Sequence, residues 1–402
     1  MQDHFDVVIV GAAVVGSAAA YFLAQDSGFC GSVLLLERDL SFQHCATTRS
    51  LASIRHQFST PENVRMSMFG TTFLRAAGEH LAVDGVAPDL AFREPGYLFL
   101  ATEAGHAVLQ ANHRVQRSEG ADIALLSPAE LGARFPWLRH DDLAGGALGL
   151  SGEGWLDAHA LMQGLRHKAV ALGAVVRQAE VVGVVRANRG GQGRVEGVVL
   201  ADGRGIGCGW LINAAGTGAT TLARQAGITL PVQSRKRCVF HFTSPAQLPG
   251  CPLVVDPTGL YFRPEGQGRH GGHGFLCGIA PPPAEDPENH DFDVPLHWFE
   301  ERLWPALAQR VPGFEAARLH SAWAGHYDLN LLDDNLILGA HPELPNLLFA
   351  NGFSGHGVQQ APAVGRALSE LVVAGQFRTL DLSALGWQRV IEQRPLRELN
   401  VV

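Results

Sequence analysis

The amino-acid sequence predicts an α/β chain in which a Rossmann-like nucleotide-binding domain is combined with an α+β domain built on a mostly antiparallel sheet. Three observations support this fold class. Residues 5–38 read as a strand, a glycine turn, a helix, a second strand and an acidic residue, in that order. Residues 229–283 consist of β-branched and aromatic runs interrupted by Pro and Gly, as is typical of antiparallel strands. Two further apolar strands, at 210–216 and 347–350, run into small residues.

The first strand and its turn have the composition of a dinucleotide-binding motif. Residues 7–10 are apolar and β-branched, as expected of a strand buried on both faces of a parallel sheet. The turn GAAVVG keeps the first and last glycines of GxGxxG, Gly11 and Gly16, and has Ala13 at the middle position. Glu37 closes the second strand about 20 residues further on, where a carboxylate accepts the hydroxyls of an adenosine ribose. The helix N-terminus then faces the pyrophosphate, which we expect Ala13 to displace slightly.

A membrane span and a signal peptide are the alternatives for this N-terminus. Residues 7–24 carry no charge, which just reaches the length of about 18 residues at which a spanning helix is considered. The two glycines, the flanking Asp3 and Asp6 and the second strand argue against a span. A signal peptide would need a basic segment before its apolar core, and this sequence has none. We therefore expect no transmembrane segment.

Composition restricts the classes of partner and compartment. With 402 residues, 46% of them apolar and 17% charged, the chain is long enough for two or three globular domains. Its net charge of −8 leaves no general basic surface, so we expect no nucleic-acid partner. The six cysteines show neither CxxC nor metal-ligand spacing. We expect free thiols in a reducing compartment, which favours a cytoplasmic protein without a metal.

A polar loop and a series of scaffold elements follow the second strand. Residues 45–58 are rich in hydroxyls, which suits the ribityl and phosphate part of a cofactor; an ordinary surface loop is the alternative. Ser127 and Glu130 form a capping box before a helix that must end before Pro136. Further elements are expected at 61–77 (helix), 97–101 (strand), 157–172 (helix capped by Asp157), 175–185 and 195–201 (strands around a turn at Gly190 and Gly191) and 295–310 (helix).

The C-terminal part of the chain contains a second glycine loop before a helix. The strand at 347–350 runs into NGFSGHGVQQA, and Pro362 can open a helix that ends at Gly375. A helix N-terminus therefore follows a glycine loop here, as it does in the first motif. The last 27 residues are expected to form a polar tail that Trp387 anchors.

Four segments resemble one known family. They are IRHQFSTPEN (54–63), PLVVDPTGLYFR (252–263), SAWAGHYDLN (321–330) and NGFSGHGVQQAPAVGRA (351–367). Together with the N-terminal motif and the NAAG strand end, they resemble the D-amino-acid oxidase/sarcosine oxidase superfamily of FAD enzymes over nearly the whole chain. More narrowly, they look like the mitochondrial members associated with the assembly of respiratory complex I and their bacterial relatives.

The resemblance implies both a domain organisation and a reaction. The FAD-binding domain would be discontinuous (1–88, 150–226 and 325–376), with a substrate domain (89–149 and 227–324) and a C-terminal tail (377–402). The reaction would be oxidation of the C–N bond of an amino acid or secondary amine by hydride transfer to the flavin N5, which is the chemistry of the cofactor. A flavin-holding assembly factor and a 2-hydroxy-acid dehydrogenase are the alternatives, because a fold does not determine its chemistry.

By the same resemblance, four parts of the chain bind FAD. The first motif holds the ADP half, the polar loop lines the phosphates and ribityl, and backbone of the mid-chain strands reaches adenine. The C-terminal glycine loop lies under the isoalloxazine ring, where N–H groups favour negative charge on the reduced ring; His356 belongs to this wall and is not a catalyst. The set is Gly11, Ala13, Val15, Gly16, Glu37, Arg38, Thr47, Arg49, Ser50, Val181, Val182, Gly216, Gly352, Ser354, Gly355, His356, Gly357, Val358 and Gln359.

Three residues are expected to meet the substrate. Arg55 matches an arginine that binds the substrate carboxylate in sarcosine oxidases; a structural arginine paired with an acid is the alternative. Tyr261 and Tyr327 match positions that face the substrate pocket, although several D-amino-acid dehydrogenases have an arginine in place of Tyr327. Gln359 replaces a lysine of sarcosine oxidases. Arg263 can compensate for these lost cations if its strand runs beside the pocket.

The lysine that activates dioxygen in sarcosine oxidases has no counterpart. Its place falls at Leu276, and residues 259–278 contain no lysine. Lys236, with Arg235 and Arg237, is expected in a solvated basic turn. The resemblance thus implies a dehydrogenase that passes electrons to a quinone or an electron-transfer flavoprotein, in the cytoplasm or peripherally at the inner membrane.

FAD is expected to be held non-covalently. The cysteine that attaches flavin in sarcosine oxidases would fall near His326, and the histidine that attaches it in other relatives falls at Ser50. His44 and Cys45 are the nucleophiles near that loop.

Overall fold

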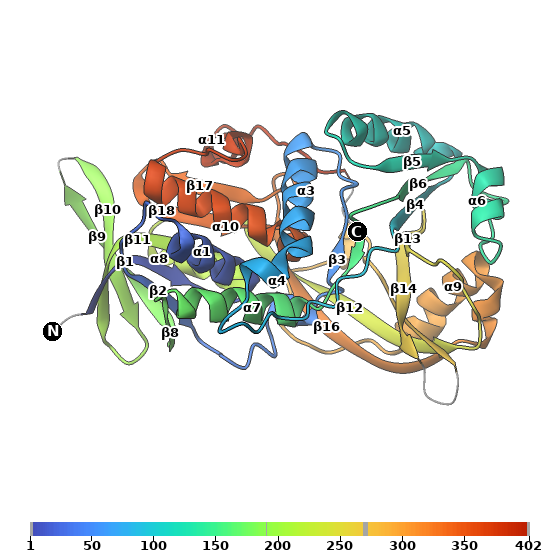
Figure 1. The fold of residues 1–402 in the computed structure, drawn as a ribbon, viewed down its shortest axis with the longest axis horizontal. Coiled ribbons are helices and arrows are strands. Elements are labelled where there is room, and N and C mark those ends of the chain that lie inside the picture. Colours follow the sequence, from blue (N-terminus) through green and yellow to red (C-terminus); the bar gives the residue numbers. More distant parts are fainter. Residues whose placement is uncertain (1–2, 190, 268–271, 400–402) are drawn as a thin grey trace.

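The computed structural model describes residues 3–189, 191–267 and 272–399, which form two units side by side, each built on an eight-stranded sheet (Figure 1). The predicted combination of a Rossmann-like α/β unit with an α+β unit is confirmed. Of the turn expected at Gly190 and Gly191, Gly190 lies outside the described residues.

The first sheet is parallel at its centre. Its strands follow the order β17-β18-β11-β1-β2-β8, in which only the β17–β18 pair is antiparallel, and the hairpin β9-β10 joins the sheet through β11. Val7, Val8 and Ile9 are fully buried, as predicted for a central parallel strand. The bounds are β1 Asp3–Val10, β2 Val33–Glu37, β8 Val175–Gln178, β9 Val181–Arg189, β10 Gln192–Leu200, β11 Gly205–Asn213, β17 Ile337–His341 and β18 Leu344–Asn351.

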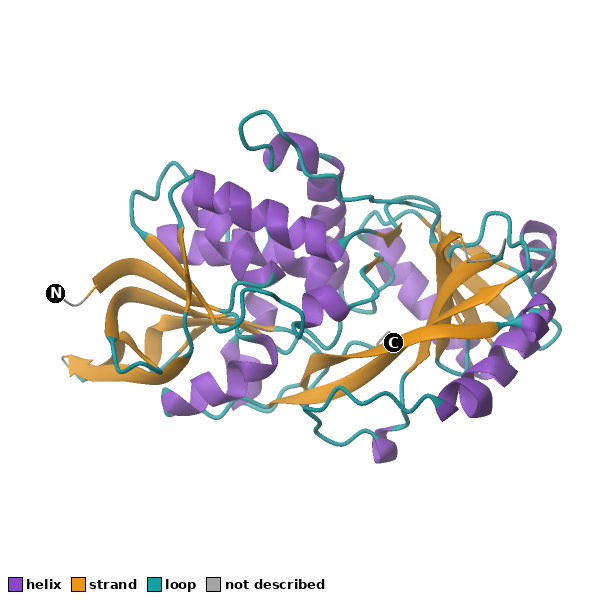
Figure 2. Cartoon of the chain, turned by 90° about the horizontal axis from the view of Figure 1, so that it is seen from below, coloured by secondary structure: helices purple, strands orange, loops and turns teal. Residues whose placement is uncertain are grey.

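Helices cover both faces of this sheet. α1 (Val14–Gln25) packs between α7 (Ala158–Ala171) and α10 (Gly357–Ala374) on one face, and α3 (Pro61–Arg75) packs on α10 (Figures 1 and 2). At the crossing of α1 and α10, a Cβ on Gly365 would lie 2.6 Å from the carbonyl carbon of Ala18, so this close backbone contact requires glycine. On the other face lie α8 (Ala219–Gln225) and α11 (Trp387–Ile391). Trp387 is buried edge-on against Phe349 and anchors the C-terminal segment as predicted.

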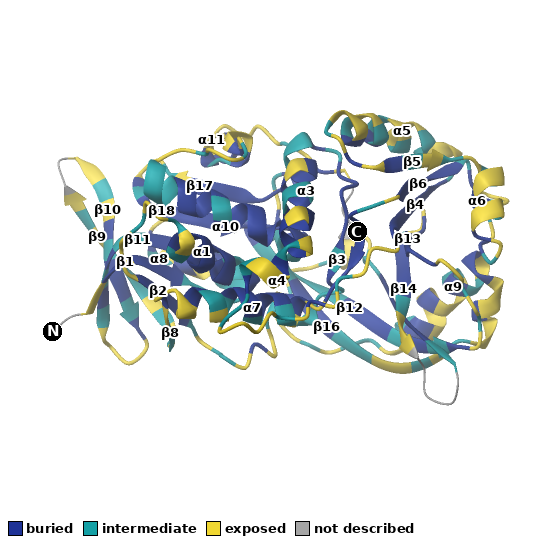
Figure 3. Ribbon diagram, viewed as in Figure 1, coloured by how far each residue is buried: buried dark blue, intermediate teal, exposed yellow. Residues whose placement is uncertain are grey.

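The second sheet is antiparallel except where β13 pairs with β4. Its order is β16-β12-β15-β14-β13-β4-β6-β5. One face packs a phenylalanine-rich core against the helices at the far end of the molecule (Figure 3); the other turns toward the first unit. The bounds are β4 Tyr97–Ala101, β5 Ile123–Leu126, β6 Gly145–Gly149, β12 Val232–Ser244, β13 Leu253–Val255, β14 Leu260–Gln267, β15 His273–Ile279, β16 Arg318–Asn330, α5 Glu103–Ser118, α6 Pro128–Arg134 and α9 Trp304–Arg310.

Short elements connect the two units. The segment after β2 forms α2 (Ala46–Arg49) and then β3 (Ser53–Ile54), which pairs with β7 (Gly154–Trp155) in a small separate sheet. α4 (Ala77–His80) follows α3. None of the described helices is long and apolar enough to cross a membrane.

The expected helix signals were right at some termini and wrong at others. The Ser127–Glu130 capping box forms, and Asp157 caps α7 through the N–H of Ala160. The helix expected at 295–310 is divided into a π turn (Phe299–Leu303) and α9. Pro362 does not open the last helix. α10 begins at Gly357, because the glycine loop turns the chain earlier. Pro362 lies inside the helix, where it has no N–H to donate to the Val358 carbonyl.

Candidate cofactor and active site

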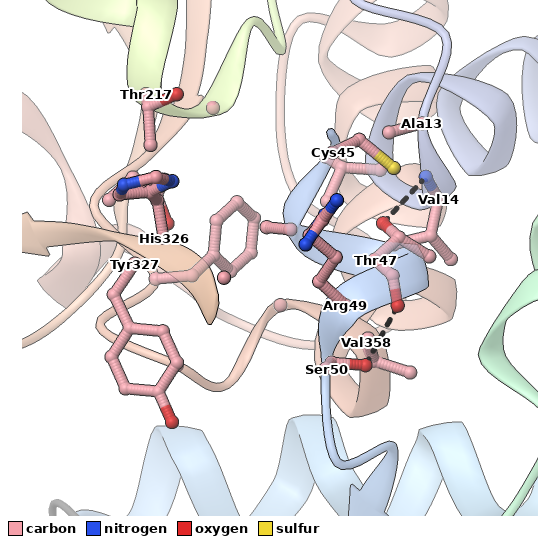
Figure 4. Close-up of a pocket in the computed structure, with 18 of the residues that line it drawn as sticks. Ala13, Val14, Cys45, Thr47, Arg49, Ser50, Thr217, His326, Tyr327 and Val358 are labelled. Carbon is pink, nitrogen blue, oxygen red and sulfur yellow. Dashed lines mark hydrogen bonds between the residues drawn. The ribbon is translucent and has the colours of Figure 1, made fainter. Parts of the chain in front are cut away.

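A cavity of about 630 Å³ lies between the two units, at the carboxyl ends of β1, β2 and β11. Its walls are the β1–α1 turn, the segment after β2, the end of β11, the inner face of β12, β14 and β16, and the start of α10. Figure 4 shows part of this lining. The predicted residues on the wall are Gly11, Ala13, Val15, Glu37, Arg38, Thr47, Arg49, Ser50, Gly216, Tyr261, Tyr327, Gly355, Gly357, Val358 and Gln359.

The glycine turn has the geometry of a pyrophosphate site. Gly11 has φ +99°, and a Cβ on it would clash with the backbone carbonyl of Ala214. A Cβ on Gly16 would clash with the backbone carbonyl of Gly11. Ala13 has φ −69° and ψ −168°, a conformation that alanine adopts without strain, so the backbone at the middle position does not itself require glycine. α1 starts here without a side-chain cap on Ala13, and its positive N-terminus therefore faces the cavity.

Glu37 is fixed at the cavity wall by the backbone. One carboxylate oxygen accepts the N–H of Ala12 at 3.0 Å and the other accepts the N–H of Asp39 at 3.1 Å. Each oxygen keeps a lone pair for a further donor. The carboxylate and the helix N-terminus thus fit the ribose and pyrophosphate of an ADP group.

The segment 45–53 forms the next part of the wall. Thr47 accepts the N–H of Val14 at 3.4 Å, and the Ser50 hydroxyl donates to the Thr47 carbonyl at 2.8 Å (Figure 4). Arg49 donates to the Ala324 carbonyl at 2.9 Å, and its guanidinium lies 4.6 Å from the ring centroid of Phe292. These contacts join the segment to α1 on one side and to β16 on the other.

The loop before α10 is held in a strained conformation. Ser354 has φ +51°, and its N–H donates to the backbone carbonyl of Asp328 at 3.1 Å. The Asp328 carboxylate accepts the Gly352 N–H at 2.8 Å, and burial raises its pKa to about 6. A Cβ on Gly355 would lie 2.7 Å from the ring of Tyr327. The loop therefore brings the N-terminus of α10 against the tyrosine-lined end of the cavity.

Seven predicted residues do not line the cavity. Gly16 packs inside the turn, while Gly352 and Ser354 brace the α10 loop from behind. Val181, which pairs with Leu200, and Val182, which is 46% exposed, are not part of the cavity lining, and the expected contact of their backbone with adenine stays a prediction. The last two are Arg55 and His356.

Arg55 is buried behind the α10 wall. Its guanidinium lies 2.9 Å from Nε2 of His356, donates to the Gln57 carbonyl at 3.2 Å, and stands 4.4 Å from the centroid of Phe58. Its backbone N–H donates to the Gln359 side chain at 2.8 Å. Burial and the Arg55 charge hold the pKa of His356 well below its usual value, so His356 is neutral and its Nε2 accepts from the arginine. In this structure Arg55 braces the loop under the cavity and does not reach into it.

Arg237 is the cation that sequence reasoning missed. It lines the cavity from β12, with its side chain 11% exposed and its guanidinium 5.1 Å from the centroid of Tyr327. Both its terminal nitrogens bind Asp286, at 2.8 and 2.9 Å, and Arg235 reaches the same carboxylate at 3.8 Å. Two arginines and one aspartate leave one net positive charge. The solvated basic turn expected here is wrong, because these residues alternate along a buried strand.

The cavity wall also offers a proton acceptor, which points away from Tyr327 along β16 (Figure 4). Burial raises the pKa of Tyr327, so its hydroxyl is neutral at pH 7. His326 lines the same wall and donates to the Asp291 backbone carbonyl, and burial lowers its pKa. Its Nε2 is buried and has no partner among the described residues. The neutral imidazole can therefore accept a proton.

No group of three or more His, Cys, Asp or Glu residues in the described ranges could hold a metal ion. All six cysteines are free, and Cys45 lies on the cavity wall.

Glu153 gives the buried network behind the site a pH dependence. It accepts the His56 N–H at 2.5 Å and the Gln57 side-chain amide at 2.8 Å, yet burial raises its pKa to about 7 from an ordinary value of about 4.5. Between these values the unfolded chain has lost the proton and the folded chain has not. The contribution of Glu153 to the free energy of unfolding should therefore fall as pH rises from 4.5 to 7, by at most about 1.4 kcal/mol per unit.

Glu153→Gln should remove this contribution, so that its free energy of unfolding falls less steeply or rises more steeply with pH than that of the wild type, whereas Glu300→Gln, a change at an exposed glutamate, should keep the wild-type slope. Denaturant unfolding of the three proteins across this pH range measures the effect. Parallel curves for wild type and Glu153→Gln would show that Glu153 is already ionised in the folded protein at low pH.

Comparison with known proteins agrees with this geometry. A family model described as "FAD dependent oxidoreductase" (DAO) matches residues 6–371. The chain is 41% identical to FAD-dependent oxidoreductase domain-containing protein 1 of Bos taurus (96% of this chain, 85% of that protein) and 26% identical to peroxisomal sarcosine oxidase of Mus musculus (92% of each). The crystal structure of L-proline dehydrogenase from P. horikoshii superposes with a TM-score of 0.82 at 24% identity, over 98% of this chain and 99% of that chain. The chain belongs to the DAO family of FAD-dependent oxidoreductases.

Proposed function

We propose that this protein is a dehydrogenase that oxidises the C–N bond of a small amino acid or secondary amine with an anionic group. The observation that carries the proposal is Arg237, a cation on the cavity wall beside the buried Tyr261 and the half-buried Tyr327, in a cluster with one net positive charge. Sarcosine and proline, named in the proteins compared above, are both secondary amines with a carboxylate. An anion on the substrate and a cation on the wall are complementary.

The cavity residues divide into cofactor-holding and substrate-holding groups. The β1–α1 turn, Glu37, Thr47 and the α10 loop would hold FAD, which when bound takes up the two electrons of the substrate C–N oxidation. Arg237 would orient the anionic group, and Tyr261 and Tyr327 would border the substrate and exclude water. The Arg55–His356 pair would keep the α10 loop in place.

We further propose that FAD is held without a covalent bond. Ser50, which lacks a ring nitrogen or thiol, occupies one attachment position, but His44, Cys45 and His326 all lie on the cavity wall. Acid precipitation should therefore leave a colourless pellet and release FAD into the supernatant. A yellow pellet would locate an attachment at one of those three residues, which peptide mapping would identify.

The reaction can be tested by anaerobic mixing with N-methyl, D- and L-amino acids and 2-hydroxy acids. Carboxylated secondary amines should bleach the flavin, and the reduced protein should reoxidise slowly in air-saturated buffer, because the strand segment 259–278 contains no lysine that could stabilise superoxide. If only 2-hydroxy acids bleach the flavin, the protein is a 2-hydroxy-acid dehydrogenase and the proposed substrate class is wrong. No bleaching by any compound would favour a flavin-holding role, and rapid reoxidation with stoichiometric hydrogen peroxide would show an oxidase.

The substrate cation can be identified with three matched variants. Arg237→Gln should raise KM for an anionic amine by roughly ten- to a hundredfold, the value of a charge-assisted contact of about 1.5–3 kcal/mol, with flavin content unchanged. Arg235→Gln removes the same charge from the cluster without touching the cavity wall, so its effect should be several-fold smaller. Arg55→Gln should instead lower flavin content. If Arg55→Gln raises KM and keeps its full flavin content, Arg55 and not Arg237 binds the substrate carboxylate.

A further inference from the structure

A second cavity, of about 730 Å³, adjoins the first. Thr47, Ser50 and Ala52 line both cavities, so the two cavities adjoin at the segment 47–52. The wall of the second cavity continues over β14, β15 and β16 of the second sheet and over the region of β7 and the start of α7. Apart from the shared segment, none of its lining belongs to the cofactor cradle.

Aromatic and apolar side chains form the inner wall of this cavity. Trp155 is buried, and Trp323 is half-buried with its indole N–H bonded to the Arg49 carbonyl at 2.9 Å. Leu276, which is also buried, lies opposite Arg263 in the β14–β15 pairing. The two indoles provide flat faces against which a conjugated ring can pack.

Arg263 supplies an unsatisfied donor to the cavity. The residue is only 5% exposed, with its guanidinium 5.0 Å from the centroid of Trp155. Its terminal nitrogens donate to the Leu51 carbonyl at 3.2 Å, to the Pro264 carbonyl at 3.0 Å and to Glu265. Its Nε has no partner among the described residues. A buried N–H without an acceptor is costly, and an oxygen atom of a ligand in this cavity would satisfy it.

The charges around the cavity are balanced. Arg93 and Arg263 are offset by Asp157 and Glu265, and Arg93, Asp157 and Glu265 are exposed at the mouth. A phosphorylated ligand would require a net positive site. The balance therefore favours a neutral ligand whose carbonyl oxygen accepts from Arg263.

We propose that this second cavity binds the electron acceptor, a neutral quinone whose ring packs against Trp155 and Trp323 and whose carbonyl accepts the Nε–H of Arg263. The proposal rests on the amine oxidation proposed above. The amine loses two electrons and two protons to become an imine; the quinone gains two electrons and two protons to become a hydroquinone. The electrons cross at the segment 47–52, and solvent at the mouth exchanges the protons.

Binding can be measured without turnover. In isothermal titration calorimetry, duroquinone should bind the oxidised, FAD-loaded protein with one site. Arg263→Gln should weaken it by about five- to tenfold, the value of one hydrogen bond. Leu276→Trp, which fills the cavity, should abolish it. Leu296→Trp, the same change at a leucine that is 56% exposed and lines neither cavity, should have no effect.

Electron transfer can be separated from amine oxidation by reducing the flavin with dithionite. Duroquinone should reoxidise wild type rapidly and both cavity variants slowly, and this result does not depend on the amine reaction. Unchanged affinity in Arg263→Gln and Leu276→Trp would overturn the proposal, as would competition between duroquinone and the amine for one site. Tighter binding of FMN than of duroquinone, lost in Leu276→Trp, would assign the cavity to a second flavin instead. If Arg263→Gln fails to fold, Leu276→Trp still decides the outcome.

Discussion

The arrangement of the cofactor site depends on the contact between Gly11 and the Ala214 carbonyl, where no side chain fits. It allows the end of β1 to turn against the end of β11, so that α1 begins at the cavity and not beyond it. Gly365 likewise allows the backbones of α10 and α1 to come close where the two helices cross. Two helix N-termini can therefore face one cavity, and the positive ends of their dipoles favour a ligand with negative charge at two separated places. A dinucleotide that becomes anionic on its ring when reduced matches that arrangement.

The second sheet acts as a wall whose two faces have different tasks. Its outer face packs Phe242, Phe262 and Phe275 around Phe314, and Phe240 of the same core lies against Phe299. Its inner face carries Tyr261, Arg263, Arg237 and Tyr327 on residues that alternate with those phenylalanines. Because neighbours in a strand point to opposite faces, packing of the phenylalanines fixes the direction of the polar side chains. The stability of the core thus sets the geometry of the site.

Buried charge is arranged differently on the two sides of the cavity. Behind the α10 loop, Arg55 meets a neutral histidine, aromatic rings and a glutamate with a raised pKa. On the opposite wall, Arg237 shares one aspartate with Arg235 and keeps a net positive charge. A cation whose donors are used by the protein stabilises a loop, whereas a cluster with excess charge can attract an anion.

The sequence alone determined the β1–α1–β2 motif, Glu37, the capping box at Ser127 and the family, because these depend on residue types at short, regular spacings. The roles of the arginines depended on tertiary structure. Arg55 lies in a motif that predicts substrate contact, yet its contacts with Phe58, Tyr97 of β4 and His356 of the α10 loop hold it away from the cavity. Arg235 and Arg237 read as a solvated turn, yet they lie in β12, where β16 pairs with them, and their side chains are only 13% and 11% exposed. Burial is produced by partners that are distant in sequence, and it decides which charged side chain faces a cavity.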